Sequence, residues 1–299
     1  MTEKIYDVVV LTDDRYIQPK DTNWYINNIL EEDGLVLNAL KRKGLKATRK
    51  SWSDPDFDWQ TTKAIIFRTT WDYFDRYEEW KEWLADTSEK TQMINPYSLI
   101  KWNMDKHYLG DLQQRGINIP ETIFIETGSS TTLKQEFEKH GWTEAILKPC
   151  ISGAARLTYR ISQENLEEHE KQFQKLIAQE AFMLQPFQHN VLSEGEVSYM
   201  VMGGQFTHAV LKKAKPGDFR VQDDFGGTVH NYPASHDEIR FAERVVAACD
   251  PQPNYARVDV IRDNHGQLAV IEMELIEPEL WFRMNPKAAE ILVESIHLD

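Results

Sequence analysis

The sequence predicts an N-terminal α/β domain followed by an α+β region made of two lobes. Strand-like and helix-like patterns alternate over the first hundred residues, which is typical of an open sheet with helices on its faces. Beyond that point strand-like patterns outnumber helical ones, which indicates an α+β region. A chain of 299 residues is long enough for two domains or three small lobes. We place the units at 1–95, 96–190 and 191–299.

The first hundred residues contain two predicted strand–helix pairs. The continuous apolar run Ile5–Leu11 is typical of a buried parallel strand. Apolar residues then recur at helical spacing over Trp24–Lys43, and Gly44 can cap that helix. A second strand, Ala64–Phe67, leads into the loop Arg68–Tyr73 and then a charged helix. Because ligands bind at the loops that follow strand ends in such sheets, this loop is a candidate binding site.

The other two hundred residues mix strands with helices. A helix capped by Asn103 or Asp105 is predicted to run to Gly116, and Pro120 precedes a short strand. Two further helices are predicted, at Gln163–Ile177 and His236–Cys249. The remaining strands are predicted at Ala145–Pro149, Phe182–Phe187, Val197–Met202, Gln205–Leu211, Tyr255–Arg262 and Gln267–Leu275.

Composition excludes several classes of protein. With 34 Lys and Arg against 48 Asp and Glu, the net charge is -14, which argues against a protein that grips nucleic-acid phosphates. Cys150 and Cys249 are the only cysteines, too few for a disulfide framework or a cysteine-rich zinc module. No apolar run approaches the roughly 20 residues of a membrane span, and a signal peptide is not evident. We expect a cytoplasmic protein with neither nucleic acid nor membrane as a partner, and leave a homo-oligomer open.

The most informative stretch is a predicted hairpin near the C-terminus. The turn cluster Asp263–Gly266 separates two runs of alternating apolar residues. If Arg262 pairs with Gln267, Asp259 lies opposite Val270. Side chains alternate along each strand, so three carboxylates then share one face of the sheet: Asp259, Glu272 and Glu274.

Two interpretations of these carboxylates stay open. Three acidic oxygens on one face repel each other unless a cation lies among them, and a set of hard ligands favours Mg²⁺ or Mn²⁺ over zinc. The alternative is a solvated polar face on which Arg257 neutralises Glu272. A one-residue slip in register would move Asp259 to the other face, so the sequence alone does not decide.

Two more segments have the composition of an anion site. Lys148 ends a buried strand and is followed by the small-residue loop Ile151–Arg156, where backbone N–H groups can approach phosphate oxygens. It is not a Walker loop, and a solvated lysine is the alternative. The second segment is the basic stretch Lys212–Arg220, whose cations can stabilise a transferred phosphoryl group or a carboxylate. Its alternative is a solubilising exposed loop.

Taken together and in order, these motifs resemble the ATP-grasp superfamily over residues 95–285. The ordered motifs are Lys106, Leu-Lys-Pro with its small-residue loop, Gln-Pro-Phe, Asp259 and Glu-x-Glu after a hairpin. The strings RTTWDY, NMDK, QPF, EGEVSY, KPGDFRVQDDFGGTV and ELIEPELWF resemble a glutathione-synthetase-like branch of that superfamily. That branch includes the O-ureido-serine cyclo-ligase of D-cycloserine biosynthesis. The resemblance implies a pre-ATP-grasp domain at 1–95, a lid or central lobe at 96–190 and a metal-binding lobe at 191–299.

The resemblance also assigns residues to ATP. It implies that two lysines contact the phosphates, that the small-residue loop covers them, that a hinge faces adenine and that Glu196 binds the ribose hydroxyls. The cofactor-binding residues are Lys106, Lys148, Ser152, Gly153, Gln185, Pro186, Phe187, Glu196 and Lys212. The metal ligands are Asp259, Glu272 and Glu274, holding two Mg²⁺ ions or Mn²⁺. The related pattern ends in Glu-x-Asn, so Glu274 replaces an amide with a carboxylate.

Catalytic and substrate residues complete the set. Arg220 matches the arginine near the transferred phosphoryl group, where it would stabilise charge. Arg257 is a second candidate catalytic residue, as a partner for a substrate carboxylate. We assign recognition of an amino-acid-like substrate to Arg68, Trp71 and Asp72, with an ordinary ion pair as the alternative for Arg68.

The resemblance implies an ATP-dependent carbon–nitrogen ligase. A carboxylate would attack the γ-phosphate to give an acylphosphate, and an amine would then displace phosphate. Metal ions and arginine would neutralise the charge that repels a carboxylate from ATP. Two alternatives stay open: an intramolecular cyclo-ligase of the O-ureido-serine type, and a catalytically inactive ATP-binding regulatory protein.

Overall fold

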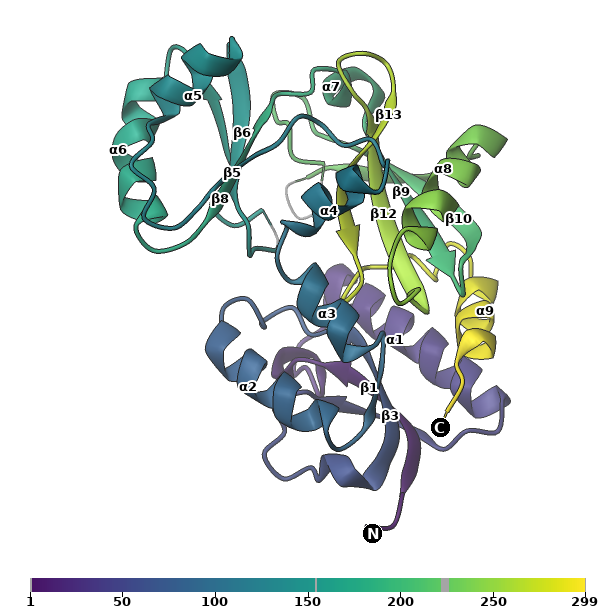
Figure 1. Cartoon of the computed structure of the whole chain (residues 1–299). Coiled ribbons are helices and arrows are strands. Elements are labelled where there is room, and N and C mark those ends of the chain that lie inside the picture. Colours follow the sequence, from purple (N-terminus) through teal and green to yellow (C-terminus); the bar gives the residue numbers. More distant parts are fainter. Residues whose placement is uncertain (1, 154, 222–225, 299) are drawn as a thin grey trace.

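The chain folds into three units, each built on its own β-sheet (Figure 1). The computed structural model describes residues 2–153, 155–221 and 226–298. In Figure 1 the N-terminal unit lies at the bottom, the central lobe at the upper left and the C-terminal lobe at the right. The predicted fold class, an α/β domain followed by an α+β region of two lobes, is confirmed.

The N-terminal unit is a parallel four-stranded sheet in the order β2-β1-β3-β4. Its strands are β1 (Tyr6–Thr12), β2 (Ala47–Ser51), β3 (Thr62–Thr69) and β4 (Gln92–Ile94), and its helices are α1 (Trp24–Arg42) and α2 (Tyr77–Ser88). The apolar run in β1 is fully buried, as a central parallel strand requires. Gly44, with φ of 83°, follows α1 in the left-handed conformation that its cap needs. The predicted strands and helices of this unit are therefore confirmed.

The central lobe is an antiparallel sheet covered by two helices. The sheet runs β5-β8-β6-β7, and α5 and α6 lie together at its outer side (Figure 1). The elements are β5 (Ile123–Ile125), α5 (Leu133–His140), β6 (Glu144–Pro149), β7 (Tyr159–Ser162), α6 (Leu166–Ile177) and β8 (Phe182–Pro186). Thr132 begins α5 with a capping box, and Gly141 ends it at φ of 68°.

The C-terminal lobe is a five-stranded antiparallel sheet, β11-β10-β9-β12-β13. Its elements are α7 (Asn190–Glu194), β9 (Glu196–Met202), β10 (Gln205–Lys213), β11 (Thr228–Asn231), α8 (His236–Ala247), β12 (Tyr255–Arg262), β13 (Leu268–Glu274) and α9 (Lys287–Ser295). The last helix, α9, packs beside α1, so the end of the chain closes against its beginning (Figure 1). No helix in the described ranges is both long and apolar enough to cross a bilayer.

The predicted residue pairing within the hairpin is wrong, but the prediction that three carboxylates share one face of the sheet is right. Arg262 pairs with Leu268 rather than with Gln267, and Asp259 pairs with Glu272 rather than with Val270. The first error alone would put Asp259 opposite Ile271 and turn Glu272 to the other face. Ile271 is instead the extra residue of a β-bulge, which shifts the register by one more residue. The three carboxylates therefore share one face, as predicted.

The single helix predicted to run to Gly116 is in fact preceded by a separate one. These two helices are α3 (Tyr97–Asn103) and α4 (Tyr108–Gln114), with Lys106 between them. Asn103 ends α3 instead of capping the next helix, because its amide is used by β13: it donates to the carbonyl of Met273 and accepts from the N–H of Leu275. Both helices pack into the core of the C-terminal sheet. The domain boundaries stay a prediction.

We predict that Asn103→Ala lowers the free energy of unfolding by about 2 kcal/mol, because it leaves a buried carbonyl and a buried N–H of β13 without their partner. Urea denaturation followed by circular dichroism measures the change. Gln174→Ala, on the exposed surface of α6, is the control and should shift stability by less than about 0.5 kcal/mol. Equal stability of the two variants would contradict the role given to Asn103.

Candidate active site

One large cavity lies where the three units meet. Its volume is about 570 Å³, and its walls come from the loops after β1 and β3, the α3–α4 connection, β6, β8 and the C-terminal sheet. Arg68 and Asp72 are not among its lining residues. The sequence-predicted residues that line it are Trp71, Lys106, Lys148, Ser152, Gly153, Gln185, Pro186, Phe187, Glu196, Lys212, Arg220, Arg257, Asp259, Glu272 and Glu274.

The three carboxylates predicted to bind metal form a tight group on one wall. One oxygen of each lies within 4.8 Å of the others. The β12–β13 pairing sets Asp259 directly opposite Glu272 and Arg257 directly opposite Glu274. On the other side of Asp259, Ser198 of β9 donates to its carboxylate at 2.5 Å. A set made only of carboxylate oxygens fits Mg²⁺ or Mn²⁺.

Cationic side chains neutralise these carboxylates. The Arg257 guanidinium donates to Asp259 at 2.8 and 3.0 Å and also to Glu274, so it lies between two of the three. Lys106 reaches Glu272 at 3.1 Å. The sequence had left open a polar face on which Arg257 neutralises Glu272. In the structure Arg257 instead contacts Asp259 and Glu274. Because these positive charges already offset the repulsion among the three acids, a metal ion that binds here must take over contacts that Arg257 and Lys106 now make.

The three acids differ in their proton affinity. Burial raises the pKa of Asp259, but Arg257 and Lys212 outweigh it and hold the pKa below its usual range. The pKa of Glu272 is also lowered, because Lys106 and Lys148 outweigh its burial. Burial together with the neighbouring carboxylates raises the pKa of Glu274 to about 7 despite Arg257. Glu274 is therefore the ligand whose charge depends most on a nearby cation.

At the predicted nucleotide end, the cross-strand partners Glu196 and Lys212 form a buried ion pair. Lys148 lies near Glu272, and burial together with Lys106 lowers its pKa. In the predicted hinge, Phe187 lines the cavity, and its backbone N–H is already used within the protein because it donates to the carbonyl of Glu144.

The phosphate loop is only partly described. The Lys106 ammonium donates to the carbonyl of Ser152 at 2.6 Å, which ties the loop to the α3–α4 connection. At Gly153 an added Cβ would lie 2.7 Å from the ring of Phe74, so only glycine allows this close approach. Ala154, within the predicted loop, lies outside the described residues. Arg220 lines the cavity and is bound by Asp218 at 2.8 Å; residues 222–225 after it also lie outside the described part.

The three predicted substrate residues separate in the structure. Trp71 lines the cavity and donates through its indole N–H to the carbonyl of Glu277 at 2.9 Å. Arg68 is 1% exposed and packs over the ring of Phe282. Asp72 accepts a hydrogen bond from Trp52 and pairs with Arg76, inside the N-terminal domain. The rule that ligands bind at loops after strand ends located a loop that reaches the cavity. It did not predict which side chains of this loop line the cavity.

Comparisons with known proteins match this arrangement. The sequence model for the N-terminal domain of D-cycloserine synthetase DcsG matches residues 8–95. The cycloserine biosynthesis protein DcsG of Streptomyces lavendulae is 28% identical over 263 residues, which cover 82% of this chain and 86% of that protein. The crystal structure of D-cycloserine synthetase DcsG has a TM-score of 0.85 and 25% identity, covering 96% of this chain and 97% of that one.

The chain is homologous to D-cycloserine synthetase DcsG and has the ATP-grasp fold. A RimK-domain ATP-grasp protein from Sphaerobacter thermophilus DSM 20745 shares the fold at a TM-score of 0.69 and 14% identity, over 97% of this chain and 99% of that one. D-alanine–D-alanine ligase from Bacillus anthracis does so at 0.64 and 13%, over 97% and 95%. The resemblance inferred from the sequence is confirmed, and so is the class of enzyme, an ATP-dependent carbon–nitrogen ligase using ATP and Mg²⁺.

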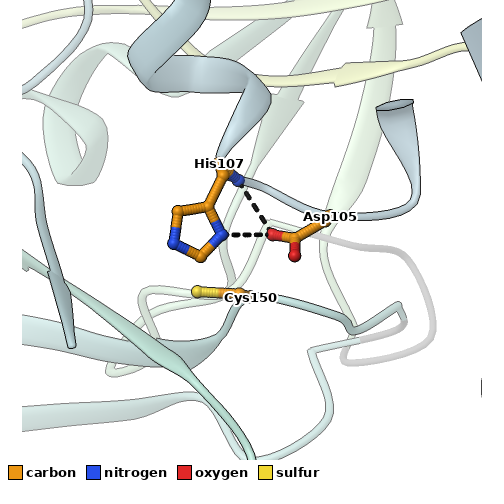
Figure 2. Close-up of side chains that lie close together, drawn as sticks. All are labelled: Asp105, His107 and Cys150. Carbon is orange, nitrogen blue, oxygen red and sulfur yellow. Dashed lines mark hydrogen bonds and ion pairs between the residues drawn. The ribbon is translucent and has the colours of Figure 1, made fainter. Parts of the chain in front are cut away.

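A second group of potential metal ligands flanks Lys106 and follows Lys148 along the chain: Asp105, His107 and Cys150. Figure 2 shows the His107 imidazole turned toward Asp105, with the Cys150 thiol beneath the ring. Both ring nitrogens already contact carboxylates, Asp105 at 2.5 Å and Glu126 at 3.1 Å. Burial raises the pKa of Cys150 to about 12, which keeps the thiol protonated.

These contacts indicate that the group holds two segments of the chain together rather than binding a metal ion. The backbone N–H of Lys106, between two members of the group, donates to the carbonyl of Cys150 at 2.8 Å. The group therefore fixes the segment that carries Lys106 to the end of β6 that carries Lys148. Nothing in the spacing of these residues along the chain signals the group, because tertiary folding brings residues 107 and 150 together.

We predict that His107 contributes stability that fades as pH rises. Burial lowers the pKa of His107, but Asp105 and Glu126 outweigh it, so the pKa is raised above the unfolded value near 6.5. The contribution is fully present below pH ~6.5 and is lost as pH rises through the higher folded-state pKa. In urea denaturation, the stability difference between wild type and His107→Gln should shrink from pH 6 to 9. In a Glu126→Gln background, which lacks one of the two carboxylates, the stability lost on His107→Gln should still shrink as pH rises, but by a smaller amount. A stability difference that grows with pH would contradict the raised pKa assigned to His107.

Proposed function

We propose that this protein is an ATP-dependent cyclo-ligase that activates the carboxylate of an amino-acid-like substrate and closes it onto a nitrogen of the same molecule. The observation that supports the proposal most is the shared cavity. Its metal-type carboxylates and phosphate lysines adjoin a wall from the N-terminal domain, the part of the chain that matches the DcsG family. A substrate bound at this wall would lie directly beside the phosphates of ATP, with no second substrate between the substrate and the phosphates.

The proposed reaction has two steps. A carboxylate oxygen of the substrate attacks the γ-phosphorus and ADP leaves, giving an acylphosphate. The nitrogen then attacks the acyl carbon, phosphate leaves, and the nitrogen gives up its proton. Water must be kept away from the acylphosphate between the steps, and a cavity closed by three units serves that purpose.

The proposed residue roles follow from the ATP-grasp resemblance. Lys106 and Lys148 would bind the phosphates, Glu196 the ribose, and the side chains of Gln185–Phe187 the adenine. Arg220 would stabilise charge on the transferred phosphoryl group, and Ser152 and Gly153 would cover it. Arg257 contacts Asp259 and Glu274, would keep them in place, and would lie near the substrate carboxylate.

The carboxylate group would hold the metal. Asp259, Glu272 and Glu274 together can take two Mg²⁺ ions, or Mn²⁺, whose chemistry when bound is to neutralise and orient the phosphate oxygens. Lys106 contacts Glu272 and Lys212 lies 3.4 Å from Asp259, so both lysines can shift toward phosphate when a metal ion replaces them. A cytoplasmic location and a homo-oligomer stay predictions of the sequence.

The test of this function is Mg²⁺-dependent ADP release by the purified protein. The panel contains D- and L-amino acids, dipeptide precursors, and O-ureido-serine of both configurations, each alone and in carboxylate–amine pairs. Cyclisation requires that a single compound stimulates release and that mass spectrometry finds a ring-closed product. Stimulation only by a pair would overturn cyclisation in favour of intermolecular ligation.

We predict that Glu272→Gln reduces Mg²⁺-dependent ADP release at least 100-fold, because an amide removes one negative metal ligand. Calorimetric titration should show weaker binding of Mg-ATP, with an unchanged circular dichroism spectrum as evidence of folding. Glu290→Gln, on the exposed surface of α9, is the matched control and should retain wild-type turnover. Full activity of Glu272→Gln would remove this residue from the metal site.

A further inference from the structure

The cavity continues past the metal carboxylates toward the N-terminal domain. Of the residues that line this end, the sequence had assigned Trp71 alone to the site. The N-terminal domain contributes one wall of this end, with Arg15, Tyr16, Tyr25, Trp71, Phe74 and Asp75, and the segment after β13 contributes Glu277 and Glu279. This end of the cavity therefore combines aromatic rings of the N-terminal domain with acids of the C-terminal lobe.

Glu277 differs from its charged neighbours Arg15 and Glu279, which are paired within the protein. Arg15 is bound to Asp13 at 2.6 Å, and Glu279 is bound to Arg283 at 2.6 Å. Across the ranges that the structure describes, no ion pair reaches the carboxyl of Glu277, and the hydroxyl of Tyr73 is its neutral neighbour. Burial and the negative charge of Glu274 raise the pKa of Glu277 to about 8. A cation placed beside this carboxyl would remove an electrostatic cost that the protein itself leaves in place.

The wall from the N-terminal domain supplies aromatic rings, which a cation prefers as neighbours. The ring of Trp71 lies 6.1 Å from that of Tyr16, edge to face, and 6.1 Å from that of Tyr25. The indole N–H of Trp71 donates to the carbonyl of Glu277, so the aromatic wall is fixed against the acidic one. Ring faces attract ammonium groups, and a nearby carboxylate adds to that attraction.

We propose that Glu277, with Tyr16, Tyr25 and Trp71, forms a subsite for the ammonium group of an α-amino acid substrate. This inference rests on the proposed function and names the group that the site recognises. Glu277 follows Glu274 by three residues, which limits their Cα separation to about 11 Å. The ammonium and carboxylate of an α-amino acid share one carbon. The substrate can therefore place its ammonium at Glu277 while its carboxylate faces the metal ligands.

The negative charges at this end of the cavity also disfavour other substrates. A second carboxylate at this end would face Glu274, Glu277 and Glu279 with Arg15, Arg257 and Arg283 already paired to acids of the protein. Dicarboxylates should therefore bind poorly. A substrate without an amino group would leave Glu277 buried without a counter-charge.

The first experiment uses the wild-type protein and needs no variant. Mg²⁺-dependent ADP release is measured with matched pairs of compounds that differ only in the α-amino group: O-ureido-serine and 3-(ureidooxy)propanoate, serine and 3-hydroxypropanoate, alanine and propanoate. For the compound that stimulates release, the partner without the amino group should have a KM at least tenfold higher. The KM for ATP should change less than twofold.

The second experiment exchanges the acid for its amide. Glu277→Gln should raise the KM for the amino acid at least tenfold, leave the KM for ATP within twofold, and remove the advantage over the compound without the amino group. Glu279→Gln changes an acid of the same wall that is already paired with Arg283, and should raise the amino-acid KM less than threefold.

The outcomes separate the two proposals. If amino acids stimulate ADP release but the α-amino group has no effect on the KM in wild type, the ammonium subsite is wrong and the ligase proposal stands. If Glu277→Gln keeps the wild-type KM while the α-amino group matters, another residue binds the ammonium and the subsite is again wrong. If no amino acid stimulates release while Mg-ATP binds, the proposed function fails and the subsite fails with it.

Discussion

The site depends on one irregularity in the C-terminal sheet, the β-bulge at Ile271. A regular pairing from the turn onward would place Asp259 opposite Ile271 and point Glu272 to the opposite face. The extra residue restores the alignment, so that Asp259 meets Glu272 and Arg257 meets Glu274. Bulges re-aim side chains in this way at many functional sites. Without this bulge, the acids that face the cavity would not form a single group.

Charge balance links the rest of the site to that group. Arg257, Lys106 and Lys212 each contact one or two of the three acids, and each is at most 9% exposed. Removing one member of such a buried network leaves its partner without a counter-charge, which is far more costly than losing a surface ion pair. The same contacts position the lysines beside the place where phosphate oxygens would lie. Stability and ligand binding therefore use the same side chains, and a metal ion or nucleotide would exchange partners within an existing network.

The three units contribute different chemistry to the cavity. The C-terminal sheet supplies the acids, and the central lobe with the α3–α4 connection supplies the lysines predicted to bind phosphate and the predicted hinge. The N-terminal domain supplies aromatic rings and lies against the acidic wall through the Trp71–Glu277 hydrogen bond. Because the compared ATP-grasp structures share the fold at 13–14% identity, the fold itself does not define the substrate. In our proposal the N-terminal wall and Glu277 define it.

The sequence by itself determined the strands and helices with strong periodicity, the ATP-grasp resemblance and nearly half of the residues that line the cavity. These properties depend on local patterns and ordered motifs, which a single chain displays directly. Short or polar elements such as β2 and β4 were missed, since their few residues lack a clear apolar repeat. Only the tertiary structure decided the bulge at Ile271, the position of Trp71 in the cavity against the burial of Arg68, and the presence of Tyr16, Tyr25 and Glu277 in the same cavity. Each of these depends on contacts between segments far apart in the chain, and such contacts are set by packing and register rather than by neighbouring residues.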